Sequence, residues 1–235
     1  GAGATNVVLG TTLPAVAGGS IGSAAYPGNG TGGIALRTNL GALGNLSTAA
    51  DGAVIVVNNI GTRALSANSG NIQQSGANSS VYLTTAGDLD ASGGMSNTAA
   101  NLLLSSGGKL TLARAGVRAN GTITLKGTQD VVAAGATPRT INVKGTTLNF
   151  SSGAAGGNTT LVTEARTIGA SLTGTSTPAN LTLTNTGALD ASLSAANGDI
   201  SATATGSRYT MVLPPKRRMY GSASVSVRAF SINRS

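Results

Sequence analysis

The acidic side chains are the main candidates for chemistry in this sequence, because the chain has no histidine and no cysteine. These absences exclude a histidine-assisted nucleophile, a thiolate and an ordinary transition-metal site. Hydrolysis by a pair of carboxylates remains to be considered, since two such groups can cleave a glycosidic bond without histidine or metal. The available carboxylates are Asp51, Asp88, Asp90, Asp130, Glu164, Asp190 and Asp199.

Asp88 and Asp90 are spaced as a pair, because residues two apart share one face of a strand. Glycosidases use carboxylates about 5–10 Å apart. Asp190 lies five twenty-residue rows from Asp88, about 24 Å away at about 4.8 Å per strand, so an enzyme would depend on Asp88 and Asp90 alone. A calcium site is the alternative, but the glycine- and aspartate-rich nonapeptide of calcium-binding β-rolls is absent. We expect solvent-facing strand residues, and no catalytic residue, metal or cofactor.

A basic cluster, Lys216, Arg217 and Arg218, stands beside Tyr209 and Tyr220 in a chain of net charge +8. Three adjacent cations near aromatic rings can hold phosphate or sulphate groups, including those of a surface polysaccharide. The alternative is a solvated loop after Pro214 and Pro215. No glycine-rich loop joins a strand to a helix, so we expect neither a nucleotide cradle nor specific nucleic-acid binding.

Threonines two apart suggest a further surface function, because regular Thr-x-Thr ladders on β-solenoids bind ice. Lys144 and Glu164 fall at corresponding places in the intervening rows and interrupt such a plane. Ice binding or carbohydrate binding by a monomer therefore stays an alternative to a structural role. The threonine pairs are Thr122 with Thr124, Thr182 with Thr184, and Thr203 with Thr205.

These side chains are carried by short strands that recur about every twenty residues. Apolar and polar residues alternate within each run, as in a strand with one buried face, so Leu110 and Leu112 should point inward and Thr111 outward. The chain is 40% hydrophobic and only 9% charged, which is unlike a disordered segment. The recurrent runs start at residues 81, 101, 121, 140, 160, 180 and 198.

This period predicts an all-β fold, a parallel and right-handed β-helix in which each strand pairs with its equivalent one coil later. An antiparallel sandwich is the alternative, although its turns usually come every 8–12 residues. We expect an N-terminal segment and cap over 1–50, coils over 51–206 and a basic loop and strand over 207–235. One inward column should contain Leu83, Leu103, Ile123, Ile141, Leu161 and Leu181.

Rows such as NLTLTNTGALDASLSAANGDISATATG, residues 180–206, resemble the β-helical repeats of filamentous-haemagglutinin-type exoproteins and autotransporter passengers. The likeness covers roughly residues 50–206 and concerns the style of the repeat. It implies an extracellular adhesive or structural rod without cofactor or catalytic residues. The chain is shorter than most such exoproteins, and their secretion domain is not recognisable at its N-terminus.

Both ends depart from the repeat and contain alternating runs suited to strand pairing. They are either caps on the terminal coils or strands that join another copy head to tail, giving a homopolymer. The start GAGATNVV, without methionine, suggests removal of a signal peptide and an extracellular or cell-surface protein, and no apolar stretch is long enough to span a membrane. The expected polymerisation contacts are Val7, Val8, Leu9, Leu13, Val16, Val225, Val227, Phe230 and Ile232.

Overall fold

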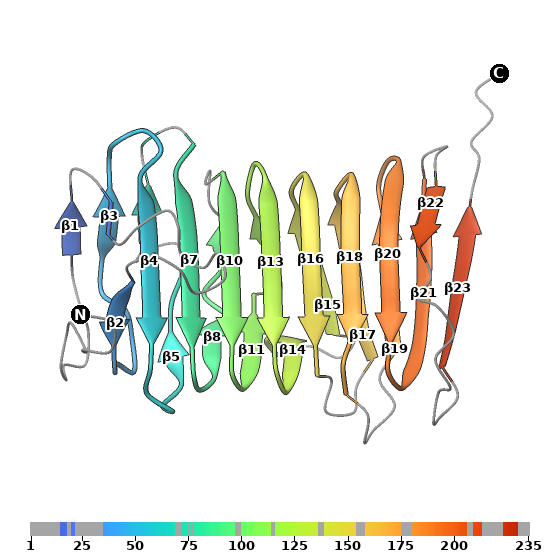
Figure 1. The fold of residues 1–235 in the computed structure, drawn as a ribbon, viewed down its shortest axis with the longest axis horizontal. Helices are drawn as coiled ribbons and strands as arrows, with labels where there is room; N and C mark the ends of the chain where they lie inside the picture. The colour runs from blue at the N-terminus through green and yellow to red at the C-terminus, as the bar shows by residue number, and fades with distance from the viewer. Residues whose placement is uncertain are drawn as a thin grey trace.

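The protein is an all-β parallel solenoid, seen in a computed structural model whose stacked coils run along the long axis (Figure 1). The expected fold class is thereby confirmed, and every strand pairing between described strands is parallel. Coils repeat about every 21 residues. The structure describes residues 15–17, 20–21, 35–68, 72–74, 76, 78–96, 100–113, 116–135, 139–153, 158–174, 180–205, 209–212 and 223–229.

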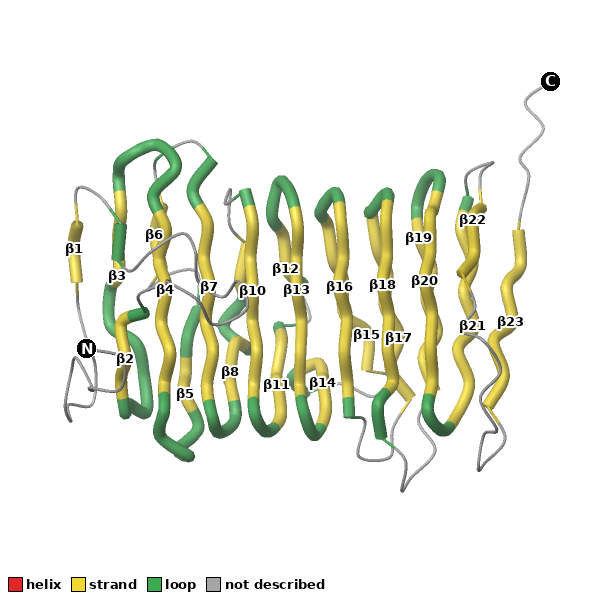
Figure 2. The backbone as a smooth tube through the Cα atoms, in the orientation of Figure 1, coloured by secondary structure: helices red, strands yellow, loops and turns green. Residues whose placement is uncertain are grey.

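A nine-stranded sheet extends along the molecule and contributes one strand to each coil (Figures 1 and 2). Its side chains alternate between core and exterior, since Leu102 and Leu104 are buried while Leu103 between them is half-buried. In spatial order its strands are β2 (Leu36–Thr38), β4 (Val54–Asn59), β7 (Ser80–Thr85), β10 (Asn101–Ser106), β13 (Thr122–Gly127), β16 (Thr147–Ser152), β18 (Thr167–Leu172), β20 (Leu189–Ala195) and β22 (Tyr209–Val212).

Three further sheets form the remaining sides of the coils. A three-stranded sheet contains β1 (Ala15–Ala17), β3 (Leu46–Thr48) and β6 (Ile72–Gln74). A four-stranded sheet contains β5 (Leu65–Ser66), β8 (Leu89–Ala91), β11 (Lys109–Leu112) and β14 (Asp130–Ala133). A seven-stranded sheet contains β9 (Met95–Ser96), β12 (Val117–Arg118), β15 (Arg139–Lys144), β17 (Asn158–Glu164), β19 (Asn180–Asn185), β21 (Gly198–Ala204) and β23 (Ala223–Ala229).

The coils change from three strands to two along the molecule. The coil formed by β13, β14 and β15 has one strand in each of the nine-, four- and seven-stranded sheets. The next coil passes from β16 directly to β17 among the described strands, and later coils do the same. The four-stranded sheet therefore ends at β14, while the nine- and seven-stranded sheets continue toward the C-terminus.

The expected single core column is wrong, because strand register departs from a constant twenty residues even before the cross-section changes: Leu83 aligns with Leu104. Ile123 on β13 aligns with Leu148 on β16, whereas Ile141 lies in the seven-stranded sheet and aligns with Leu161. Leu103 points to the outer side, aligned with Tyr82 and Thr124. A twenty-residue alignment stays in phase by numbering while the chain moves from one sheet to another, so it joins residues that do not stack.

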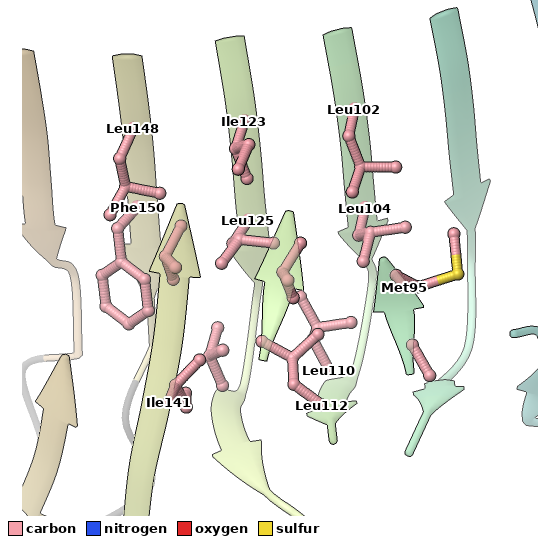
Figure 3. Packing of buried hydrophobic residues seen from close by; sticks show 14 of the residues in the cluster. Met95, Leu102, Leu104, Leu110, Leu112, Ile123, Leu125, Ile141, Leu148 and Phe150 are labelled. Carbon is pink, nitrogen blue, oxygen red and sulfur yellow. The ribbon is translucent and has the colours of Figure 1, made fainter. Parts of the chain in front are cut away.

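The larger of two hydrophobic clusters among the described residues is a column of mostly aliphatic side chains between the sheets (Figure 3). Leu110 and Leu112 are fully buried and Thr111 is half-buried on the outer side, as the alternation predicts. The single buried phenylalanine among the described residues, Phe150, aligns with Leu125 on one side and with small Ala170 on the other. A large residue beside a small one keeps the core volume nearly constant from coil to coil.

Small polar residues occupy the inward position at the corner where the nine-stranded sheet ends. Thr85, Ser106 and Ser152 are buried there, and their hydroxyls bond to the backbone of the turn. Ser106 Oγ donates to the Gly87 carbonyl at 2.8 Å. Ser152 Oγ accepts the Val131 N–H at 3.1 Å, so it satisfies an amide of β14, the last strand of the four-stranded sheet.

Strand pairing extends beyond residues 51–206 in both directions. Two strands that precede residue 51 are paired with later ones: β2 pairs with β4, and β3 pairs with β6. Beyond residue 206, β22 pairs with β20 and β23 pairs with β21. The stretch 223–229 is thus one more parallel strand of its own solenoid, in register with β21 over its whole length.

Candidate functional site

Asp88 lies just before strand β8 and Asp90 lies within it, and both carboxylates accept backbone hydrogen bonds. Asp88 Oδ1 accepts the Lys109 N–H of the next coil at 2.7 Å, and Asp90 Oδ1 accepts the Ser92 N–H at 2.9 Å. Asp88 is exposed and Asp90 half-buried. Among the described residues no three acidic, histidine or cysteine side chains group together as metal ligands would. Each carboxylate thus accepts a backbone hydrogen bond, and this bond accounts for its position in the structure.

Most of the expected contact residues lie outside the described residues: Val7, Val8, Leu9, Leu13, Phe230, Ile232 and the cluster Lys216, Arg217 and Arg218. Val16 belongs to β1, where it aligns with Ser47 of β3. Val225 and Val227 belong to β23, where they align with Ile200 and Ala202 of β21. Val16, Val225 and Val227 therefore lie in strands at the ends of their sheets.

The two ends of the solenoid present strand edges. At the N-terminal end, β1 and β2 are the outermost strands of the three- and nine-stranded sheets; at the C-terminal end, β22 and β23 are the outermost strands of the nine- and seven-stranded sheets (Figure 1). The four-stranded sheet reaches neither end. At each end, two strands thus have a neighbour on one side only among the described strands of their sheets, and a strand in that position can pair with a further strand.

The Thr-x-Thr pairs lie on two different faces. Thr122 and Thr124 are half-buried on the nine-stranded sheet, whereas Thr182 and Thr184 are exposed on the seven-stranded sheet. Thr184 aligns with Thr203 on one side, but with Val162 on the other. The threonines therefore do not form one plane along the molecule.

Gly169 lines a hollow of about 310 Å³ on the outer face of the nine-stranded sheet. Its φ is not left-handed, and an added Cβ would meet only Asn149 Oδ1, at 3.5 Å. Neither backbone conformation nor packing therefore requires glycine here, although glycine weakens a strand. Hydroxyl, amide and ammonium groups surround the hollow, from Thr124, Lys126, Asn149, Ser151, Ser171, Ser192 and Ser194.

A second hollow, of about 150 Å³, lies on the outer face of the seven-stranded sheet. Arg118, Lys144 and Glu164 form a row across three neighbouring strands at its rim. Lys144 Nζ pairs with a carboxylate oxygen of Glu164. This pairing, with a smaller contribution from Arg118, lowers the pKa of Glu164 below its usual 4.5. The repeat alignment placed Lys144 and Glu164 at corresponding positions, but it did not indicate that Arg118 joins them in one row.

Comparisons of the chain with protein-family models, curated proteins and solved structures found no match. Within the described part of the chain, no helix long and apolar enough to cross a membrane was found. The sheet ends and the two outer faces are therefore the surfaces from which a function can be inferred.

Proposed function

We propose that the protein is a non-enzymatic structural subunit of an extracellular homopolymer, in which copies stack head to tail through the strand edges at their ends. The observation that carries this proposal is that each end has two outermost strands among those described, β1 and β2 at one end and β22 and β23 at the other. A β-sheet edge is a template for another strand unless something blocks it.

The direction of the strands supports stacking between unlike ends. All described strand pairs are parallel, so β22 of one copy and β2 of the next can pair without reversing either chain. Such a contact is heterologous and propagates as a fibre when the rotation between copies does not close a ring. The resemblance of the repeats to haemagglutinin-type exoproteins adds the expectation of a secreted, adhesive rod.

A proline series in β23 tests this function. Successive residues of a parallel strand direct their N–H groups to opposite neighbours, and proline removes the N–H. Ser224→Pro, Val225→Pro, Ser226→Pro and Val227→Pro should therefore fall into two alternating classes. One class faces β21 and should weaken the fold; the other faces outward and should abolish filaments in negative-stain micrographs while the circular dichroism spectrum and melting temperature are retained.

The contrary outcomes are equally clear. If the unaltered protein stays monomeric in sedimentation velocity at high concentration, the homopolymer is wrong. If filaments persist in every folded proline variant, β23 is not the contact. Asp199→Asn, on the neighbouring strand β21, is the matched control and should keep both fold and filaments.

Binding of a neutral polysaccharide is a second candidate function, favoured by the hollow at Gly169. A site that leaves space above a strand, surrounded by hydroxyl and amide groups, suits the hydroxyls of a sugar chain. Gly169→Thr should fill the hollow with little effect on folding. Loss of binding to a polysaccharide array in that variant would support this function, provided that the unaltered protein and the Thr173→Ala variant both bind. Unchanged binding in Gly169→Thr would exclude this hollow.

A further inference from the structure

We infer that the hollow on the seven-stranded sheet binds the carboxylate of an acidic sugar, with Arg118 as its anchoring cation. The inference is independent of the proposed assembly, because the hollow lies on a lateral face of the coils and not at a sheet end. The ligand class is a uronate-containing polysaccharide that lies along the face.

The charges of the row leave one cation uncompensated. Arg118 and Lys144 are aligned neighbours on β12 and β15, and Lys144 and Glu164 are aligned on β15 and β17. Glu164 pairs with Lys144, while Arg118 is exposed and has no ion pair among the described residues. Like charges directly opposite on a sheet are unfavourable, so a second anion beside Arg118 would offset the repulsion between Arg118 and Lys144.

The chemistry of the row suits a carboxylate in particular. A guanidinium presents two parallel N–H groups to a carboxylate, a geometry that an ammonium cannot offer. The ion-paired groups remain accessible, with exposed fractions of 58% for the Lys144 side chain and 55% for that of Glu164. A ligand can therefore reach this row without unfolding any part of the coil.

The rest of the hollow suits one sugar ring. Val162 is 37% exposed, the one large hydrophobic side chain in the described part of the chain that is so exposed, and it offers a surface for the apolar face of a ring. Asn142 and Thr186 line the same hollow with polar side chains. Its volume of about 150 Å³ is below the roughly 300–1,000 Å³ of pockets that enclose a drug-sized ligand, so it accommodates one unit of a longer chain.

Titration of the whole chain with a galacturonate trisaccharide, followed by calorimetry and amide NMR shifts at constant ionic strength, tests the inference. Arg118→Gln should weaken binding about tenfold or more, because a charge-assisted pair is lost. Arg118→Lys should recover only part of the affinity. Glu164→Gln should strengthen binding about two- to fivefold, because it removes a competing negative charge.

Arg166→Gln is the matched control, since Arg166 is an exposed cation on the same part of the chain that does not line the hollow. Equal weakening by Arg166→Gln would reduce the effect to general charge attraction and overturn the site. A neutral galactose trisaccharide should not bind here; equal affinity for it would overturn the carboxylate. Tighter binding of a sulphated trisaccharide, or of a short peptide through its C-terminal carboxylate, would overturn the assignment to a uronate.

Discussion

Thr163 and Asn185 join two neighbouring coils inside the wall of the solenoid: Thr163 Oγ1 donates a hydrogen bond of 2.7 Å to Asn185 Oδ1. The same oxygen accepts the Ala165 N–H at 3.0 Å. Thr38 and Asn59 repeat the arrangement on another sheet, with a bond of 2.8 Å. Both asparagines are fully buried, so each satisfies the backbone of the preceding corner from within.

Replacing Asn185 by alanine should therefore destabilise the protein, because the Ala165 N–H and the Thr163 hydroxyl both lose their acceptor in a buried place. We expect a loss of about 1–3 kcal/mol in the free energy of unfolding, measured by urea denaturation. The neighbouring variant Thr184→Ala, at an exposed position, should change stability by less than about 0.5 kcal/mol. Equal effects of the two variants would contradict a structural role for Asn185.

Two strand glycines should respond oppositely to alanine. At Gly127 an added Cβ would lie 2.0 Å from the Asp130 carbonyl oxygen, so Gly127→Ala should cost about 1–3 kcal/mol by overpacking. At Gly169 the added Cβ has room, and Gly169→Ala should stabilise the strand by about 0.5–1 kcal/mol. Thermal unfolding of both variants distinguishes them, and a destabilised Gly169→Ala protein would show that the hollow is needed for folding.

The ion pair of Lys144 with Glu164 should make stability depend on acid pH. Because the folded pKa of Glu164 lies below 4.5, the carboxylate contributes stability above pH 4.5, and this contribution is lost as the pH falls through the folded value. NMR titration of the Glu164 carboxyl should give a midpoint below 4.5 that rises in Lys144→Gln. A midpoint at or above 4.5 in the unaltered protein would contradict the pair.

The change from three-stranded to two-stranded coils can be tested with paired cysteines, because the chain has none of its own. Thr124 aligns with Asn149, and neighbouring strands bring Cα atoms within the roughly 4.4–6.8 Å that a disulfide requires. Thr124→Cys with Asn149→Cys should oxidise to a disulfide within one chain. Thr124→Cys with Asn142→Cys, the pairing that a column with Ile123 beside Ile141 would give, should not.

The sequence predicted the parallel solenoid and the alternation at Leu110, Thr111 and Leu112, because a period of two within strands and a constant spacing between them both appear in the residue order. The sequence did not predict that Ile123 on β13 aligns with Leu148 on β16. That register depends on β14 lying between β13 and β15, and a short strand followed by a glycine-rich connection looks alike in three- and two-stranded coils.

The surface features were less accessible to sequence reasoning. Arg118 joins Lys144 and Glu164 only through strand register, and Gly169 is one of 35 glycines. Its peculiarity, free space above a strand, is visible only in three dimensions. The backbone hydrogen bonds of Asp88 and Asp90 are of a kind that aspartate commonly forms near turns.

Cross-linking of a mixture of two single-cysteine proteins tests the head-to-tail contact most directly. One protein carries Arg37→Cys on β2 and the other Thr210→Cys on β22, at opposite ends of the nine-stranded sheet. Under assembly conditions, a short bismaleimide should join unlike proteins in the mixture and leave each protein uncross-linked when alone. Cross-links between like proteins, or none in the mixture, would contradict head-to-tail stacking.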